Sequence, residues 1–407
     1  MKNFKWILSN VLLASLGLGS CHQPAKHAPT RNVAHVLDSS MGSCPYLTRT
    51  TTGNIVLSWI RQDAGNATVW FTYFDKSTQA FQPPREIPTS QGVEPHGENM
   101  PKMVFQGEGR ILAMYGVKNP QPDNPYTGAV YYTWSVDSGR HWTKGQPLFS
   151  SSGSFDQRYF DIALLPSGQV GAVWLNNSEP TGSTLYFATT GTDGKFGTAK
   201  VIARHTCQCC RTDLFCDSAG TIHVAWRAII GDSIRDMEYC YSSDTGKTFT
   251  VPVRISADNW VVSGCPHTGP SMAENEGALH FVWFTMGGGG GVYYCHTRDT
   301  GRNFSMREPV SQITSARHPQ IAALPGGDLA IVWDEGAGTA TIPHQRIGLQ
   351  LRGPGGLLLS TRYVSSDSIS AYFPQIAVMD NSRALIAYTE SDGPGERICY
   401  RIVGMKP

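Results

Sequence analysis

Two short segments of the sequence concentrate cysteine and histidine. The first is residues 205–211 (HTCQCCR), and the second is residues 264–267 (GCPH). Thiolate sulfur and imidazole nitrogen together are ligands that Zn(II) and Cu(I) prefer in proteins. The two segments therefore predict a Cu or Zn site, and its expected ligands are Cys207, Cys209, Cys210, Cys265 and His267.

Disulfide bonds and a redox-active thiol pair are the alternatives to a metal site. Apart from Cys21 near the N-terminus, nine cysteines remain in the chain. An odd number in an exported protein requires a free thiol, an intermolecular bridge or a metal site. The spacing is not that of a standard zinc module, so these alternatives stay open. The pairings considered are Cys209 or Cys210 with Cys265, and Cys207 with Cys216 or Cys44.

The elements that must hold these segments are repeated strands. An apolar strand, a turn and a second apolar strand ending in an aromatic residue recur at intervals of 50 to 59 residues. Enrichment in Val, Ile, Tyr and Trp without a long 3.6-residue period indicates strands. About four strands in about 55 residues is typical of a propeller blade. The closing aromatic residues are Trp59, Tyr115, Trp174, Trp226, Trp283, Trp333 and Tyr388.

The sequence thus predicts an all-β fold, a β-propeller of seven four-stranded blades. The last repeat has three clear strands, and we expect residues 32–37 to supply its fourth strand and close the ring. Six blades plus an accessory sheet is the alternative.

A polar or reactive residue precedes the first strand of each predicted blade, sixteen positions before the closing aromatic. First strands surround the axis of a propeller, and alternate side chains of a strand point to the same side. We expect these residues to converge at one end of the axis, which we call the axial face; ordinary polar loops are the alternative. The seven residues are Ser43, Asn99, Arg158, Cys210, His267, Arg317 and Tyr372.

Three turns share the pattern Ser/Thr-x-Asp-x-Gly-x-x-aromatic, at residues 135–142, 242–249 and 297–304. The hydroxyl and the carboxylate can bind amides of their own turn, and the glycine supplies a positive φ. The motif resembles the Asp-box of the sialidase superfamily of propellers, and the resemblance extends over nearly the whole chain at the level of blades. In that family Asp-boxes lie away from the active site, so Asp137, Asp244 and Asp299 are expected to be structural.

The resemblance also implies catalytic residues. Residues 370–376 (SAYFPQI) are similar to the segment that carries the tyrosine nucleophile of sialidases, which implies this role for Tyr372. Arg227 and Arg317 resemble members of the arginine triad that binds the substrate carboxylate. The first-blade arginine of the family is absent, and only Asp213 stands near the place of the glutamate that activates the tyrosine.

Sialidase chemistry needs guanidinium groups that bind a carboxylate bidentately and a carboxylate that activates the phenol. A phenol of pKa about 10 is otherwise neutral at pH 7. Sialidases depart from the two-carboxylate glycosidase scheme in this respect. Arg158, Asn99 and His318 are expected to bind the ligand beside the catalytic residues.

The N-terminus indicates export and anchoring. Lys2 and Lys5 precede an apolar run too short to span a membrane, so residues 1–20 read as a signal peptide. Residues 18–21 (LGSC) resemble a bacterial lipobox, which implies lipidation of Cys21 and an extracytoplasmic lipoprotein that faces the periplasm or lies on the cell surface. Residues 21–31 read as a tether, and residues 32–407 as the propeller.

The sequence therefore implies a membrane-anchored, sialidase-like propeller that binds a carbohydrate at its axial face. If its catalytic set is complete, it is an exo-sialidase-type glycoside hydrolase that requires no cofactor. The alternative is a non-catalytic or metal-binding lipoprotein that uses the Cys/His cluster. The net charge of +1 does not suggest a nucleic-acid partner, and we expect a monomer.

Overall fold

The structure is a computed structural model, and it describes residues 34–38, 40–63, 65–122, 124–149, 156–177, 182–339, 342–393 and 395–406. The expected signal peptide, the tether and Cys21 lie outside these residues. Among the described residues, none belongs to a helix with the length and apolar character needed to cross a membrane.

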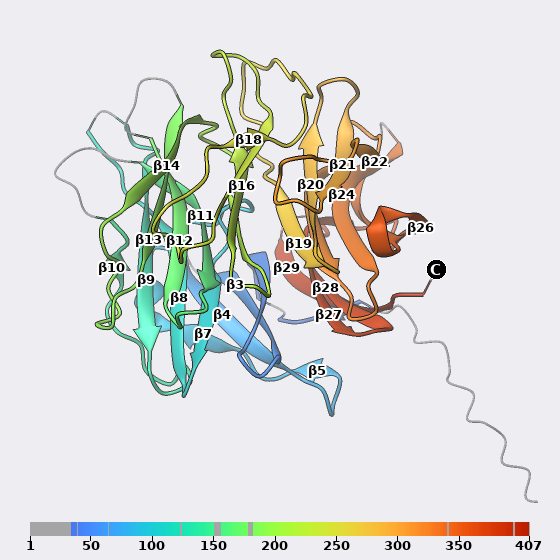
Figure 1. Cartoon of the computed structure of the whole chain (residues 1–407). Coiled ribbons are helices and arrows are strands. Elements are labelled where there is room, and N and C mark those ends of the chain that lie inside the picture. Colours follow the sequence, from blue (N-terminus) through green and yellow to red (C-terminus); the bar gives the residue numbers. More distant parts are fainter. Residues whose placement is uncertain are drawn as a thin grey trace, which may run out of the picture. The chain divides into compact units, whose positions relative to one another are not determined.

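The described residues form seven sheets, which are the blades of a propeller (Figure 1). The first four blades are β2 (Gly42–Arg49), β3 (Ile55–Asp63), β4 (Asn66–Asp75) and β5 (Ala80–Phe81), with β6 (Arg85–Ile87) also on β4; β7 (Lys102–Gly107), β8 (Arg110–Lys118), β9 (Gly128–Ser135) and β10 (Gln146–Pro147); β11 (Gln157–Leu164), β12 (Val170–Asn176), β13 (Ser183–Thr189) and β14 (Lys200–Thr206); and β15 (Asp213–Cys216), β16 (Ile222–Arg227), β17 (Met237–Ser242) and β18 (Val253–Arg254).

The last three blades complete the ring. They are β19 (Ser271–Asn275), β20 (Ala278–Thr285), β21 (Gly291–Thr297) and β22 (Glu308–Ser311); β23 (Arg317–Ala323), β24 (Leu329–Thr339), β25 (Ile342–Arg352) and β26 (Leu358–Tyr363); and β27 (Ser370–Asp380), β28 (Arg383–Ser391), β29 (Glu396–Gly404) and β1 (His35–Val36). Two short 3-10 turns, η1 (Pro88–Ser90) and η2 (Pro354–Gly356), lie in connections.

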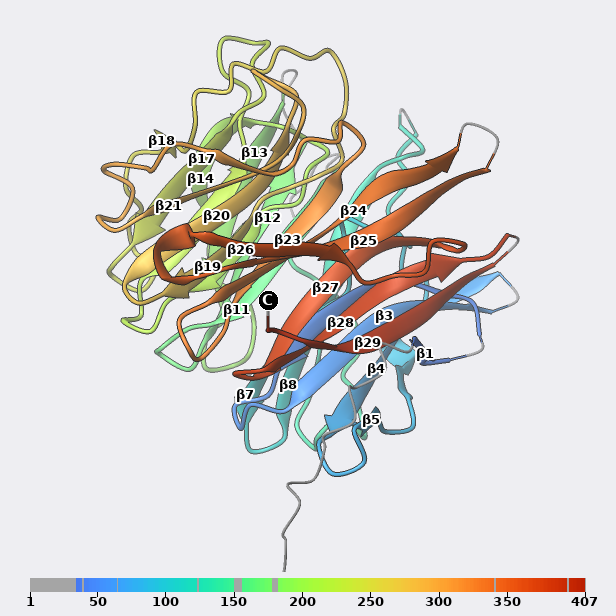
Figure 2. The same ribbon diagram turned by 90° about the vertical axis from the view of Figure 1, so that its right-hand side faces the viewer.

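Seven blades and closure by the N-terminal strand are confirmed. Each innermost strand contacts the innermost strand of the next blade, and β27 contacts β2. Strand β1 pairs antiparallel with β29, with His35 opposite Tyr400 (Figure 2). In Figure 1 the outer strands β10 and β26 lie at opposite edges of the view, with the inner strands β11 and β19 between them.

The closing aromatics explain how the blades pack. All seven lie on the second strand of a blade and are almost completely buried. Each belongs to an apolar cluster shared with the preceding blade: Trp59 packs with Tyr400 of blade 7, and Trp226 with Leu175 of blade 3. The repeat read from the sequence is therefore the spacing of the contacts between blades, which hold most of the apolar core.

The three Asp-box turns have the predicted geometry. In the first, the amides of Arg140 and His141 donate to Asp137 at 3.0 and 2.9 Å, and the amide of Gly139 donates to the Ser135 hydroxyl at 2.9 Å. These turns follow third strands, whereas the axial face lies where the chain enters first strands. Since successive strands are antiparallel, the Asp-boxes lie at the opposite end of the blades.

Candidate functional site

A bulge marks the start of several innermost strands. The pairing register shifts between Ser43 and Tyr46 in β2, and at the matching place in β11, β23 and β27. The residue inside each bulge has a left-handed backbone although it is not glycine, which is uncommon and re-aims its side chain. These residues are Cys44, Tyr159, His318 and Phe373, with φ of 60°, 53°, 51° and 53°.

The strand register changes one of the seven residues that the sixteen-residue spacing assigned to the axial face. In blade 5, Ser271 is opposite Val282, so Pro270 is opposite Trp283, whereas in blade 7 the residue opposite the closing aromatic Tyr388 is Pro374, one position further from it along the chain. The residue equivalent to Tyr372 and Arg317 in that blade is therefore Thr268, which is fully buried, while His267 is exposed one residue further out.

The connection from blade 1 to blade 2 reaches across the axial face. Glu98 forms an ion pair with Arg211 of blade 4 and accepts a hydrogen bond of 2.8 Å from the amide of Gly269 in blade 5. A Cβ on Gly97 would lie 2.1 Å from the ring of Phe373 of blade 7, so that ring lies directly on the Gly97 backbone. Residues 94–98 thus tie blades 4, 5 and 7 to one loop.

Three histidines gather beside this loop. The His96 ring lies 5.4 Å from the Tyr159 ring and 5.9 Å from the His267 ring, measured between centroids. Burial lowers the pKa of His96; the nearby charges of His267, Arg158 and His318 lower it further, against the opposing effect of Glu98. A buried imidazole among cationic groups is held neutral at neutral pH.

His318 is oriented by a buried carboxylate. Its Nδ1 lies 2.7 Å from Oδ2 of Asp334, and the same oxygen accepts a 2.8 Å hydrogen bond from the amide of Phe373. The Phe373 ring packs against His318 in a tilted arrangement, 4.1 Å between centroids. A histidine fixed at one nitrogen by a carboxylate leaves its other nitrogen free to exchange a proton.

Tyr372 has a carboxylate partner that was not expected from the sequence. Its hydroxyl donates a 2.6 Å hydrogen bond to Oε1 of Glu396, the first residue of β29. Both side chains are half-buried. Burial and the charge of Glu396 raise the pKa of Tyr372, so the phenol is neutral at rest and Glu396 is placed to accept its proton.

The expected ligand-binding residues Arg158 and Asn99 already have protein partners. Nε of Arg158 lies 2.7 Å from Asp156, and its Nη1 lies 3.7 Å from Glu94. Asn99 is buried, and its side-chain oxygen accepts a 2.9 Å hydrogen bond from the amide of Tyr159.

The two arginines compared with the sialidase triad both donate to backbone carbonyls, and only Arg227 is buried behind the axial face. Arg227 is 1% exposed, and its Nη atoms donate to the carbonyls of Arg235, Thr268 and Phe284. The guanidinium of Arg317 lies 3.6 Å from the centroid of the Phe284 ring and donates to backbone carbonyls. Arg227 therefore presents no free guanidinium face to the solvent, whereas Arg317 is partly exposed.

Asp213 lies deeper along the axis than Tyr372. Its Oδ2 accepts a 2.6 Å hydrogen bond from the amide of Met272 in the next blade. In the same way, Oδ2 of Asp161 accepts a 2.8 Å hydrogen bond from the amide of Leu214, one blade further on. Nζ of Lys102 lies 2.8 Å from Asp161. Burial and the charge of Asp161 raise the pKa of Asp213 to about 7. These groups join the first strands of successive blades.

The structure brings all five expected metal ligands together. The sulfurs of Cys207, Cys209 and Cys210 lie within 4.8 Å of one another, and so do the ligand atoms of Cys209, Cys265 and His267. The nine cysteines of the described residues are free thiols. A cavity of about 310 Å³ lies beside them, lined in part by His205, Gln208 and Cys209.

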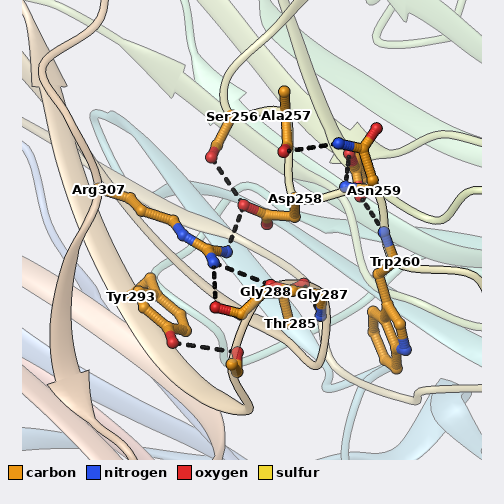
Figure 3. Close-up of polar contacts among 12 residues, drawn as sticks. Ser256, Ala257, Asp258, Asn259, Trp260, Thr285, Gly287, Gly288, Tyr293 and Arg307 are labelled. Carbon is orange, nitrogen blue, oxygen red and sulfur yellow. Dashed lines mark hydrogen bonds and ion pairs between the residues drawn. The ribbon is translucent and has the colours of Figure 1, made fainter.

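The connection that carries Cys265 and His267 is anchored at its base (Figure 3). Asp258 accepts hydrogen bonds from Ser256 at 2.7 Å and from Arg307, and Arg307 also donates to the carbonyls of Gly287 and Gly288 at 2.9 Å. The ring of Trp260 lies 5.0 Å from the Arg227 guanidinium. The segment therefore starts from a fixed point next to the cysteine cluster.

No protein-family model matches the chain, and no curated protein matches it in sequence. Solved structures do match. They include the BP39L lectin from Burkholderia pseudomallei (TM-score 0.61, 10% identity, 90% of this chain and 100% of that chain), an ulvan lyase (0.59, 12%, 91% and 96%) and a Hadza microbial sialidase (0.50, 16%, 87% and 73%). At these identities the similarity establishes the fold: the chain has the propeller architecture found in sialidases and polysaccharide lyases.

Sequence reasoning missed Glu396 and Asp334 as neighbours of the axial residues. Asp334 directly follows the closing aromatic Trp333, the same place that Arg227 holds after Trp226. That position was a usable signal. Glu396 gave none, because a third strand has no fixed spacing to the axis.

Proposed function

We propose that this propeller binds a carbohydrate at its axial face and cleaves a glycosidic bond there. The observation that carries the proposal is the Tyr372–Glu396 pair at 2.6 Å, next to the His318–Asp334 pair in the neighbouring blade. Tyr372 is the nucleophile, Glu396 accepts its proton, and His318 exchanges a proton with the leaving group or with water. The lectin, the lyase and the sialidase with this fold are named for carbohydrates, which supports the ligand class.

An acidic sugar is the ligand class that the basic residues favour. Arg317 is partly exposed at the start of blade 6, and a guanidinium binds carboxylates bidentately. A sialic acid, as implied by the resemblance, is the first substrate to test, and uronic-acid polysaccharides are the second.

The test measures turnover of both substrate classes with two readouts. One is the release of reducing ends, and the other is the ultraviolet absorbance of an unsaturated product. Release of sugar without that absorbance indicates hydrolysis, as proposed. Unsaturated product would indicate elimination, in which proton transfer by His318, and not nucleophilic attack by Tyr372, is the chemical step. Saturable binding without turnover would leave a lectin-like function and remove the catalytic role of Tyr372.

The proposal includes anchoring through a lipid on Cys21 at an extracytoplasmic membrane surface, with the propeller as a monomer. It is supported by the apolar leader and the LGSC segment. Mass spectrometry of the mature N-terminus tests the lipid, and Cys21→Ala is expected to release the protein from the membrane fraction. Light scattering of the released form tests the monomer.

A further inference from the structure

The geometry of the three neighbouring thiols matches one metal ion. The sulfur of Cys207 lies 3.6 Å from that of Cys209 and 3.9 Å from that of Cys210. Metal–sulfur bonds of about 2.3 Å at tetrahedral angles place sulfurs about 3.8 Å apart, and a trigonal set only slightly further. Bonded sulfurs would be about 2.0 Å apart, so these thiols are spaced for coordination and not for a disulfide.

We propose that Cys207, Cys209 and Cys210 bind one thiophilic d10 ion, Cu(I) or Zn(II), and that Cys209, Cys265 and His267 form an outer position through which the ion reaches it. The two sets share Cys209. The inner sulfurs belong to residues that are 1–4% exposed, whereas Cys265, which lines the cavity, and His267 are exposed. The ion therefore exchanges ligands at Cys209 while moving from solvent to the buried set.

The fold fixes the inner set before an ion arrives. The amide of Cys207 donates to the carbonyl of Arg227 at 2.8 Å, and the amide of Ile229 donates to the carbonyl of His205 at 2.7 Å. Cys207 is thereby held at the end of β16, and the side chains of Cys209 and Cys210 are buried, so the three sulfurs have little freedom to lose on binding.

A buried cation balances the charge of the complex. Three thiolates with Cu(I) carry a charge of −2, and with Zn(II) a charge of −1, after the three thiol protons leave to solvent. The Arg227 guanidinium is buried, and the carbonyl of the same residue accepts the 2.8 Å hydrogen bond from the amide of Cys207, so this cationic residue lies directly beside the cluster. A buried anionic complex requires such a partner, which gives Arg227 a role apart from substrate binding.

The test uses the full chain, reduced and handled anaerobically, with Cu(I) and Zn(II) supplied separately. Elemental analysis and competition with a chromogenic chelator are expected to show one tightly held ion. X-ray absorption is expected to show that three sulfur ligands bind it. The metal held by protein purified from the cell without chelator identifies the ion, because affinity alone does not set metal selectivity in the cell. Cys210→Ser should weaken binding by more than the roughly 10–100-fold that loss of an outer-shell partner costs.

The exposed residues give a different expected result. Cys265→Ser and His267→Gln should leave the equilibrium stoichiometry at one ion and slow loading, while Cys216→Ser, a thiol outside both sets, should change neither quantity. Absence of uptake by the wild-type protein with all thiols reduced would overturn the proposal. A disulfide between Cys209 and Cys265 in protein isolated from the cell would also overturn it. Equal loss of equilibrium binding in Cys265→Ser and Cys210→Ser would overturn the two-position arrangement.

Discussion

Glu98 and Arg211 form a buried ion pair across the axial face, although they lie 113 residues apart in the sequence. Arg211 also donates to the carbonyl of Pro319 at 2.7 Å, so the pair connects the loop after blade 1 with blades 4 and 6. The loop that it holds carries His96 and Gly97 to their contacts with Tyr159 and Phe373.

Removal of one partner should therefore destabilise the propeller strongly. Glu98→Ala leaves the Arg211 charge buried without its partner, which typically costs about 3–5 kcal/mol of unfolding free energy. Glu94→Ala is the matched control, since Glu94 is more exposed and lies 3.7 Å from Arg158; it should cost less than about 1 kcal/mol. Chemical denaturation measures both, and equal costs would contradict the role given to the pair.

Tyr372→Phe should abolish turnover with little change in fold. The substitution removes the hydroxyl that donates to Glu396. In Glu396→Gln the proton acceptor is removed instead, and kcat should fall by about 10²–10⁴-fold. Tyr241→Phe, on the third strand of blade 4, is the control that keeps full activity. Measured kcat values check this, and an unchanged kcat in Tyr372→Phe would rule out the nucleophile.

Asp213 should make stability depend on pH. Its pKa is raised to about 7, above the ordinary value of 3.8, so the folded protein binds more protons than the unfolded chain between these values. Stability should thus fall as pH rises through this window, by at most about 1.4 kcal/mol per pH unit. Asp213→Asn should flatten this dependence in denaturation curves at pH 4.5 to 7.5. Parallel wild-type and variant profiles would contradict the assignment.

Gly97→Ala should disturb the axial face through Phe373. The added methyl group would overlap the Phe373 ring, which must then move away from His318. The free energy of ligand binding should change by more than the free energy of unfolding. Phe373→Ala combined with Gly97→Ala should bind better than Gly97→Ala alone, because the overlap is gone. Additive losses in this double-mutant cycle would show that the contact is not the cause.

The number of blades could be predicted because packing repeats are local in sequence. Trp59 and Trp226 recur where each second strand meets the preceding blade, and Asp137 fixes a turn with atoms only four residues away. The fixed sixteen-residue spacing assigned His267 instead of Thr268 in blade 5, where Pro270 is opposite Trp283. A one-residue change in the length of the hairpin between the first two strands changes which residue faces the axis, and the apolar pattern of the second strand does not reveal it.

The sequence alone determined that cysteine and histidine cluster in residues 205–211 and 264–267, and that strands repeat seven times around them. Only the tertiary structure decided that Cys209 belongs to two ligand sets, that Arg227 lies behind the axial face and that Tyr372 meets Glu396. The reason is physical: hydrogen-bonded turns and strand periods are set by neighbours along the chain, whereas the axis is formed by side chains from all blades, and their distances exist only once the ring is closed.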